Sequence, residues 1–299
     1  MKSSTLARVK TNPLKTNPLV RPFLKWAGGK RQLLPEIIKS LPNPKLTSKH
    51  TYYEPFIGGG ALLFELQPSK AVINDSNKEL INCYQVIKDS LDELMEELRK
   101  DKYNNSETSY YDMRDLDRSK KYAKLSAVEK AARIIYLNKT CYNGLFRVNS
   151  QGQFNVPFGR YKNPNFLDDA VLRAVNKYLI STEITMSNLD FAKAIEGAKK
   201  GDFVYLDPPY DPVSETASFT GYDVNGFNRD EQERLKKVFD DLTQRGCKVM
   251  MSNSCTDFIL DLYKDYQDTV KKVRATRSIN SNALKRGMVD EVLILNYEI

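Results

Sequence analysis

The sequence predicts an α/β fold in which a seven-stranded, mostly parallel sheet carries an inserted helical domain. Short runs rich in β-branched and aromatic residues alternate with helical segments near both ends of the chain. Between residues 79 and 179 this alternation stops and helical periodicity dominates. Alternating strands and helices favour a parallel sheet covered on both faces. We therefore expect a sheet domain of residues 1–78 and 180–299 and an inserted domain of residues 79–179.

Composition and charge narrow the class of protein. The chain has 299 residues, 41% hydrophobic and 28% charged, which is typical of a soluble globular protein. The net charge of +8 favours a polyanionic partner, although a solvated lysine surface also explains it. The single histidine, His50, and four cysteines without a C-x-x-C pair disfavour a zinc site and a histidine-dependent triad. No apolar run approaches about 18 residues, so we expect a reduced, cytoplasmic protein.

A polar segment and a glycine motif open the chain. Residues 1–20 contain a duplicated Thr-Asn-Pro-Leu, and we expect a loosely ordered arm there. Residues 23–30 read Phe-Leu-Lys-Trp-Ala-Gly-Gly-Lys and lead into a helical pattern over 30–40. The two glycines let the backbone approach a ligand, and the flanking lysines suit an anionic group. A surface helix with a buried Trp26 explains the motif equally well.

Strand, glycine turn and helix then follow in the order of a nucleotide-binding fold. Residues 51–54 form the strand, Pro-Phe-Ile-Gly-Gly-Gly the turn and residues 61–66 the helix. A second strand at 71–74 ends in Asp75, 17 residues after Gly58, where an acid can bond a ribose hydroxyl. The glycine spacing is not G-x-G-x-x-G, which disfavours NAD. A purely structural glycine turn is the alternative.

The inserted segment combines helices with one irregular stretch. Helical patterns cover residues 79–100, 107–116, 126–138 and 168–179. Residues 142–161 interleave aromatic, amide and arginine side chains with turn glycines. Such side chains stack on bases, bond base edges and hold phosphates. We expect a recognition hairpin here, with a helical lid that has no role in DNA binding as the alternative.

The α/β pattern resumes after residue 180. Strand-like runs occupy residues 182–186, 203–206, 247–252, 269–273 and 291–297, and helices fit 190–199, 229–244 and 256–264. The last two strands are joined without a clear helix, so one of them is expected to run antiparallel. Their loop carries Arg274, Arg277, Lys285 and Arg286, which suits either contact with a DNA backbone or a solvated loop.

Asp207, Pro208, Pro209 and Tyr210 follow the buried strand at 203–206 directly. Proline has no N–H, so the two prolines leave the strand ladder and stiffen the loop. A carboxylate, a free carbonyl and an aromatic ring are thereby held just past the strand's carboxyl end, where ligands bind in open α/β sheets. A strand that ends in a proline-rich turn is the alternative.

Five motifs occur in order within residues 22–297. They are Lys-Trp-Ala-Gly-Gly-Lys, Glu-Pro-Phe-Ile-Gly-Gly-Gly, Asn-Gly-Leu-Phe-Arg-Val-Asn, Phe-Asn-Val-Pro-Phe-Gly-Arg-Tyr and Asp-Pro-Pro-Tyr. In this order they resemble the α group of the Dam-type DNA N6-adenine methyltransferases. The resemblance looks nearest to the Dpn-type GATC methylases. It extends to Val213-Ser214-Glu215-Thr216, the segment that follows the Asp-Pro-Pro-Tyr motif. The resemblance implies the Rossmann-like fold of S-adenosylmethionine-dependent methyltransferases.

S-adenosyl-L-methionine is the methyl donor that the resemblance implies. The residues that match cofactor-binding positions are Trp26, Lys30, Glu54, Phe56, Gly58, Gly60, Asp75, Asp190 and Asp207. From the sequence alone, Asp190 is equally well explained as a helix N-cap.

Double-stranded DNA is the substrate that the resemblance implies, with GATC as the target. The residues that match DNA-binding positions are Lys25, Tyr142, Asn143, Leu145, Arg147, Pro157 and Arg160. Arg147 suits a bidentate contact with guanine, Leu145 and Pro157 suit a thymine methyl, Tyr142 suits stacking into the gap left by a flipped base, and Arg160 suits a phosphate.

The catalytic residues implied by the resemblance are Asp207, Pro208, Pro209 and Tyr210. Adenine N6 is a poor nucleophile, and we expect the Asp207 carboxylate and the Pro208 carbonyl to accept its two hydrogens while Tyr210 stacks on the flipped base. This chemistry requires no metal. The rivals are a methyltransferase acting on RNA or on a protein glutamine, an inactive DNA-binding module and an NAD-dependent oxidoreductase. We further expect a monomer or weak dimer, with a cognate restriction endonuclease as its functional partner.

Overall fold

The computed structural model describes residues 16–26, 30–42, 49–212, 226–276 and 288–299. Four sequence predictions lie wholly or partly outside these ranges: residues 1–15 of the arm expected over 1–20, the glycines at 28 and 29, the Val-Ser-Glu-Thr motif over 213–216, and the charged loop over 277–287. None of the helices in the described ranges has the length and apolar character that a bilayer-spanning helix needs.

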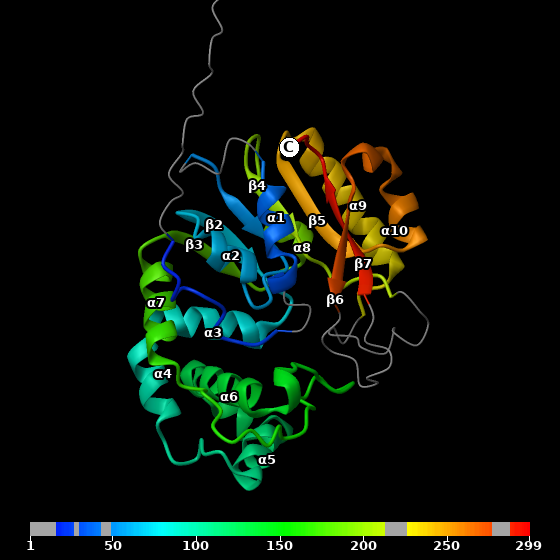
Figure 1. Ribbon diagram of the computed structural model, residues 1–299. Helices are drawn as coiled ribbons and strands as arrows, with labels where there is room; N and C mark the ends of the chain where they lie inside the picture. The colour runs from blue at the N-terminus through cyan, green and yellow to red at the C-terminus, as the bar shows by residue number, and fades with distance from the viewer. Residues whose placement is uncertain (1–15, 27–29, 43–48, 213–225, 277–287) are drawn as a thin grey trace, which may run out of the picture.

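A seven-stranded mixed sheet forms the centre of the molecule, in the order β3-β2-β1-β4-β5-β7-β6 (Figure 1). The strands are β1 (Tyr52–Glu54), β2 (Lys70–Asn74), β3 (Glu183–Ser187), β4 (Phe203–Leu206), β5 (Lys248–Ser254), β6 (Lys271–Thr276) and β7 (Met288–Leu295). Strands β1 to β5 pair in parallel, whereas β7 runs antiparallel to both of its neighbours. The predicted fold class is confirmed, including one antiparallel strand near the end of the chain.

Helices cover both faces of this sheet and form the insertion. The α-helices are α1 (Leu34–Lys39), α2 (Ala61–Leu66), α3 (Lys78–Asp89), α4 (Leu91–Leu98), α5 (Glu107–Asp115), α6 (Ala127–Thr140), α7 (Asp169–Ile180), α8 (Phe191–Ala194), α9 (Arg229–Gln244) and α10 (Asp257–Leu262). Short 3-10 turns occur at η1 (Lys30–Gln32), η2 (Leu116–Arg118), η3 (Tyr122–Lys124), η4 (Tyr142–Gly144) and η6 (Lys264–Thr269).

Three elements differ from the sequence prediction. The helix expected over 79–100 is two helices, because Ser90 leaves helical geometry (φ −143°) between α3 and α4. The helix expected over 190–199 ends at Ala194, three residues before Gly197, and glycine disfavours helix continuation. The expected hairpin over 142–161 forms only in part: it has the isolated bridges Cys141–Phe158 and Val148–Phe154 and backbone bonds between residues 147–149 and 153–155, but no continuous strands.

Strict alternation along the strands divides the core between the two sheet faces. On β1, Tyr52 packs into one hydrophobic cluster with α1, α2, α3 and α7, and its neighbour Tyr53 packs into a second cluster with α8, α9 and α10. Successive strand side chains point to opposite faces, so each strand contributes to both clusters. The sheet is thus buried on both sides, as a parallel arrangement requires.

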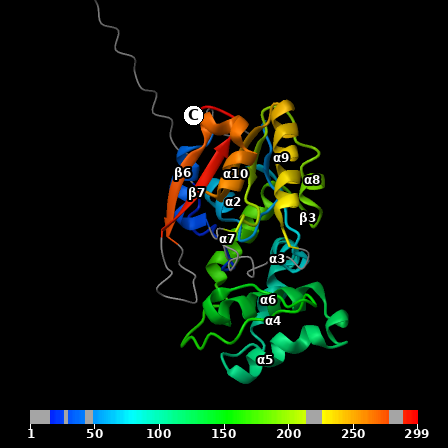
Figure 2. The same cartoon turned by 90° about the vertical axis from the view of Figure 1, so that its right-hand side faces the viewer.

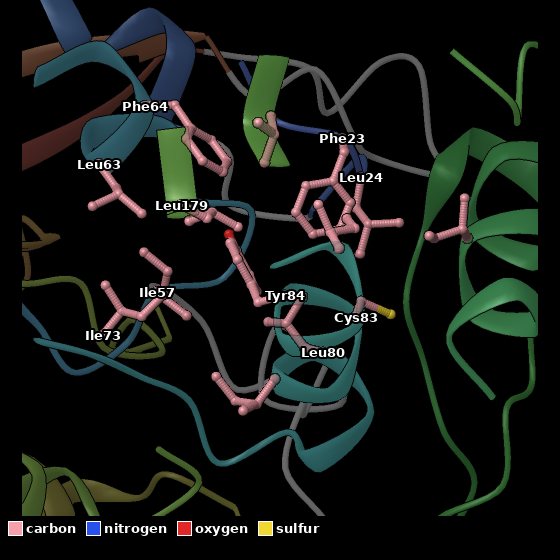
Figure 3. Close-up of a cluster of buried hydrophobic side chains, with 14 of the residues drawn as sticks. Phe23, Leu24, Ile57, Leu63, Phe64, Ile73, Leu80, Cys83, Tyr84 and Leu179 are labelled. Carbon is pink, nitrogen blue, oxygen red and sulfur yellow. The ribbon is translucent and has the colours of Figure 1, made fainter. Parts of the chain in front are cut away.

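Helices α4, α5 and α6 lie away from the sheet, with α3 and α7 between them and the sheet in both views (Figures 1 and 2). Tyr84 of α3 lies at the centre of this junction, surrounded by Phe23, Leu24 and Ile57 (Figure 3). Its ring meets the Phe23 ring edge-on with centroids 4.9 Å apart. The first hydrophobic cluster therefore continues from the sheet through α3 into the insertion.

Candidate active site

The carboxyl ends of β1, β2 and β4 bring the predicted catalytic and cofactor residues together. Strand β4 is fully buried and ends at Leu206, so Asp207 emerges at the edge of the sheet between β1 and β5. We call Asp207-Pro208-Pro209-Tyr210 the catalytic loop. Glu54 closes β1 and Asp75 follows β2 at the same edge. This edge is where open parallel sheets bind their ligands.

One oxygen of Asp207 is held firmly, and the other is available. Lys30 Nζ lies 2.8 Å from Asp207 Oδ1, and Ser252 Oγ donates to the same oxygen at 2.9 Å. Tyr205 OH lies 3.0 Å from Ser252 Oγ, so these hydrogen bonds continue into the core. Asp207 Oδ2 receives no hydrogen bond from any residue that the structure describes. It is therefore free to accept a hydrogen bond from a ligand.

The charge of Asp207 is set by two opposing effects. Burial raises the pKa of its carboxyl group above the usual value, because a charged group is poorly solvated there. The Lys30 ammonium group and the Ser252 hydroxyl group lower the same pKa, and burial outweighs them. Lys30 thus helps to keep a partly desolvated carboxylate ionised.

The two proline carbonyls of the catalytic loop have different surroundings. Gln232 Nε2 of α9 donates to the Pro209 carbonyl at 2.8 Å. The Pro208 carbonyl accepts no hydrogen bond within the described ranges. The acceptor predicted from the sequence, Pro208, is therefore the carbonyl that remains available.

Tyr210 is fixed at both its hydroxyl group and its ring. Tyr210 OH donates to Glu291 Oε2 of β7 at 2.9 Å, and Lys30 Nζ lies 4.4 Å from the ring centroid. The ammonium group covers one face of the ring, which is a favourable cation–π arrangement. A planar ligand that stacks on Tyr210 must therefore use the opposite face.

The glycine turn after β1 is built around close contacts. Gly58 has φ +47°, and a Cβ there would lie 2.8 Å from Trp26 Cδ1. Gly60 has φ +70°, and a Cβ there would lie 2.6 Å from the Tyr84 hydroxyl. Side chains other than hydrogen are excluded at both positions. The turn is also tied to β2, because Gly58 N donates to Asp75 Oδ2 at 3.0 Å.

Three carboxyl groups face one another across this edge. Glu54 is 3% exposed, and its Oε2 accepts a hydrogen bond of 2.7 Å from Tyr52 OH. Burial raises the pKa of Glu54 well above its usual value, and the charges of Asp207 and Asp75 raise it further. Lys30 contacts this group through Asp207. The excess of acidic groups suits a ligand that carries positive charge and hydroxyl groups.

Asp190 forms the N-cap of α8 and accepts from Ala192 N at 3.0 Å. Its two oxygens also accept from Arg234 Nη1 and Nη2 at 2.9 and 2.7 Å, and Arg234 lowers the pKa of this carboxyl group. Nearby, the Phe56 ring lies 5.2 Å from Phe191 and 5.8 Å from Phe227 between centroids. Phe56 therefore belongs to an aromatic wall beside the glycine turn.

The irregular stretch 142–161, which we call the recognition arm, stands against the same edge. Its Phe146 ring stacks on Trp26 with centroids 5.0 Å apart. Lys25 exchanges hydrogen bonds with buried Asn138 of α6, from Lys25 N to Asn138 Oδ1 at 2.8 Å and from Asn138 Nδ2 to Lys25 O at 2.7 Å. Lys25 Nζ lies 4.9 Å from the Tyr161 ring centroid. The predicted cofactor and DNA-binding segments are thus in direct contact.

Most of the predicted DNA-binding side chains are exposed on this arm. Tyr142, Asn143, Arg147, Pro157 and Arg160 are exposed, and Leu145 is half-buried. Arg147 Nε and Nη2 donate to the Asn155 carbonyl at 2.9 and 2.5 Å, which leaves the Nη1 edge outward. Arg160 has φ +52° and lies 3.6 Å from Glu107.

Comparison with known proteins identifies the family. Residues 26–279 match the model of the D12 class N6 adenine-specific DNA methyltransferases. The chain belongs to this D12 class. It is 47% identical over 287 residues to the type II methyltransferase M1.LlaDCHI of Lactococcus lactis subsp. cremoris, covering 96% of this chain and 99% of the relative. It is 44% identical over 292 residues to the type II methyltransferase M.MjaIII of Methanocaldococcus jannaschii, covering 93% and 99%.

A third relative links the chain to the DNA adenine methylases. The DNA adenine methylase of Escherichia coli K12 is 35% identical over 278 residues, covering 92% of this chain and 95% of the relative. As a D12 class enzyme, the chain is an S-adenosylmethionine-dependent methyltransferase that acts on adenine N6 in DNA. The predictions of family, enzyme class and cofactor are confirmed.

Several residues of this D12 class site were not predicted from the sequence. Ser252, Asn253, Gln232 and Glu291 contact the catalytic loop directly or through one another, and Asn138 holds Lys25. One signal was present in the sequence: Ser252-Asn253-Ser254 places three polar residues in an otherwise apolar strand. Polar residues in a buried strand indicate hydrogen-bond partners, but the sequence does not name them.

Proposed function

We propose that this D12 class enzyme methylates adenine N6 within GATC in double-stranded DNA, using the catalytic loop on a flipped base. The observation that carries the proposal is the pair of available acceptors, Asp207 Oδ2 and the Pro208 carbonyl, beside the fixed ring of Tyr210. An adenine amino group has two hydrogens and a planar ring, and this loop offers one acceptor for each hydrogen and one surface for the ring.

The residues at the sheet edge fit S-adenosylmethionine. Its sulfonium and ammonium groups suit the excess of carboxyl groups, and its ribose hydroxyls suit Asp75. The residues that would hold it are Trp26, Lys30, Glu54, Phe56, Gly58, Gly60, Asp75 and Asp207. When bound, it supplies a methyl group that is already activated by the sulfonium. Asp190 belongs to the predicted set, and its ion pair with Arg234 favours a role in shaping the adjacent loop.

Hydrogen bonding by the catalytic loop makes the amino group a better nucleophile. The N6 lone pair is delocalised into the ring, so transfer requires a more tetrahedral nitrogen. Bonds from N6 to Asp207 Oδ2 and to the Pro208 carbonyl favour that geometry, and they strengthen as positive charge develops on N6. After transfer, Asp207 Oδ2 is the nearest base that can take the departing proton. Tyr210 holds the ring on the face opposite Lys30.

The recognition arm supplies the readout of GATC. Arg147 is held on the Asn155 carbonyl, which orients its outer edge for a bidentate contact with guanine. Leu145 and Pro157 contact thymine methyl groups, and Tyr142 stacks into the gap that the flipped adenine leaves. Lys25, whose side chain packs against Gly144, and Asn143 contact bases, and Arg160 contacts a phosphate.

Methyl transfer to defined duplexes tests this proposal. We expect incorporation of labelled methyl groups into duplex DNA that contains GATC, and loss of cutting by a nuclease specific for unmethylated GATC. The Asp207→Ala variant should bind DNA yet lose at least about 100-fold in transfer rate, because an electrostatic contact to the developing charge is removed. Equal incorporation into duplexes without GATC would refute the target, and substantial transfer by the Asp207→Ala variant would refute the role of the loop.

The type II methyltransferase relatives favour a role beside a cognate restriction endonuclease. Both M1.LlaDCHI and M.MjaIII carry the type II name, and each aligns over nearly its whole length. An enzyme in this role should protect host DNA by methylating every GATC site. Complete protection of plasmid DNA in cells that express the chain supports this role, and protection of only a minority of sites argues against it.

A further inference from the structure

Three consecutive side chains of β5 hold the two ends of the catalytic loop. Ser252 Oγ donates to Asp207 Oδ1 at 2.9 Å, before the prolines, and Asn253 Oδ1 accepts from Asp211 N at 3.0 Å, after Tyr210. Ser254 Oγ donates to the Asp211 carbonyl. All three β5 residues are fully buried. Buried polar side chains are costly unless they are hydrogen-bonded, and here their bonds are made to the loop.

A buried pair of amides links this strand to α9 and to the middle of the loop. Asn253 Nδ2 donates to Gln232 Oε1 at 3.0 Å, and Gln232 Nε2 donates to the Pro209 carbonyl at 2.8 Å. Gln232 is 1% exposed and Asn253 is 0% exposed. Each amide both accepts and donates, so the orientation of both groups is determined. This series of hydrogen bonds runs from Asp211 N–H through Asn253 and Gln232 to the Pro209 carbonyl.

The residue after Tyr210 is anchored further. Asp211 is 2% exposed, and its carboxylate accepts from Thr256 Oγ1 at 2.7 Å and from Arg229 Nε at 3.2 Å. Asp211 is therefore a fixed point from which Tyr210 projects. Peptide planes are rigid and proline fixes φ, so bonds at Pro209 and Asp211 leave little freedom to the peptide groups between them.

We propose that the Gln232–Asn253 amide pair is a positioning device for methyl transfer. By holding the Pro209 carbonyl towards α9, it leaves the Pro208 carbonyl directed at the adenine amino group, and it fixes the plane of the Tyr210 ring through Asp211. Two apolar side chains of similar volume would fill the same space, but would leave the Pro209 carbonyl and the Asp211 N–H unpaired. The inference rests on the proposed role of the catalytic loop.

The Gln232→Leu variant tests the device. With DNA and cofactor saturating, the single-turnover rate should fall about 100-fold, because a displacement of about 1 Å at the reacting atoms has an effect of that size. The dissociation constant for GATC duplex should stay as in the parent enzyme. A matched control is Asn296→Leu at the other end of β5, where the amide bonds Val249 N, Thr243 Oγ1 and the Cys247 carbonyl. This control should lower the melting temperature and leave the single-turnover rate unchanged.

The pH dependence of the methyl-transfer rate distinguishes a positioning role of Gln232 from a purely structural one. In the Gln232→Glu variant, a protonated carboxyl group can donate to the Pro209 carbonyl and still accept from Asn253, whereas the ionised form cannot donate. Its rate relative to the parent should therefore rise as the pH falls, while the Gln232→Leu variant should show no such recovery. A parent-like rate in Gln232→Leu would overturn the inference, as would equal loss of rate in Asn296→Leu.

The two proposals fail in different ways. If the Asp207→Ala variant transfers methyl groups at the parent rate, the role of the catalytic loop fails, and the positioning device fails with it. If Asp207→Ala is inactive while Gln232→Leu keeps the parent rate, only the positioning device fails.

Discussion

In the proposed mechanism Asp207 meets two requirements that conflict, because it must be buried against a flipped base and must also stay ionised. Burial raises its pKa, and Lys30 at 2.8 Å lowers it. A protonated carboxyl group cannot accept the N6 hydrogen at Oδ2 as a carboxylate does. The rate of methyl transfer should therefore fall as the pH drops through the raised pKa of Asp207.

Removal of the Lys30 charge should extend this loss of activity to higher pH. In the Lys30→Met variant, burial acts on Asp207 without the opposing ammonium group, so the pKa of the carboxyl group rises further. The midpoint of the acid limb in the single-turnover rate, measured with saturating cofactor and DNA, should move to higher pH. Lys70→Met is the control, since Lys70 forms an ion pair with exposed Glu183. A midpoint that stays in place, or moves to lower pH, would contradict the role of Lys30.

The residues proposed for catalysis are predictable from the sequence because they lie within one short motif. Asp207, Pro208 and Tyr210 fall within four consecutive positions, and the roles proposed for them follow from a carboxylate, a backbone carbonyl and an aromatic ring. Gln232 and Asn253 were missed because they lie in different elements and gain their roles only when α9 and β5 meet the loop. A glutamine in an amphipathic helix has no distinguishing local pattern.

At the level of elements, the strands were predictable and the recognition arm was predictable only in part. A buried strand such as β4 is a continuous apolar run, which the sequence shows directly. The arm was expected to pair with itself as a hairpin. It pairs with itself only in part, with Asn149 N donating to the Gln153 carbonyl and Asn155 N to the Arg147 carbonyl. Other groups of its backbone bond to side chains of the insertion, with Tyr110 OH donating to the Val156 carbonyl, Arg118 Nη2 to the Phe154 carbonyl, and Phe154 N to Asp117 Oδ2. These partners come from other elements of the fold, so the sequence of the arm does not show them.

The recognition arm carries Arg147, for which we propose a contact with a base. The Arg147→Ala variant should lose about 1–3 kcal/mol of discrimination between GATC and duplexes changed at the guanine, because one bidentate base contact is removed. Competition between matched duplexes in a methyl-transfer assay measures this. The control is Arg173→Ala, whose guanidinium group lies in surface ion pairs with Asp92 and Asp169. Unchanged discrimination in Arg147→Ala would remove Arg147 from the readout.

At the level of the whole molecule, the insertion shares a hydrophobic cluster with the sheet. One hydrophobic cluster runs from Tyr205 and Met250 of the sheet, through Tyr84 of α3, to Leu94 and Ile134 in α4 and α6. The domain boundaries predicted at residues 79 and 179 follow the change in periodicity, which records a change in element type. A change in periodicity does not show whether the core is divided, so continuity of the core was not visible in the sequence.

A continuous core should make sheet and insertion unfold together, which chains of this length often do not do. Leu94 of α4 is 0% exposed, and the Leu94→Ala variant should lose about 2–5 kcal/mol in the free energy of unfolding through lost burial and a residual cavity. Calorimetry should show one transition in the parent and one transition at lower temperature in the variant. Ile180→Ala, at a side chain that is 59% exposed, should change the transition little. A Leu94→Ala variant in which a separate early transition appears, while the main one keeps its parent temperature, would show instead that the insertion unfolds by itself.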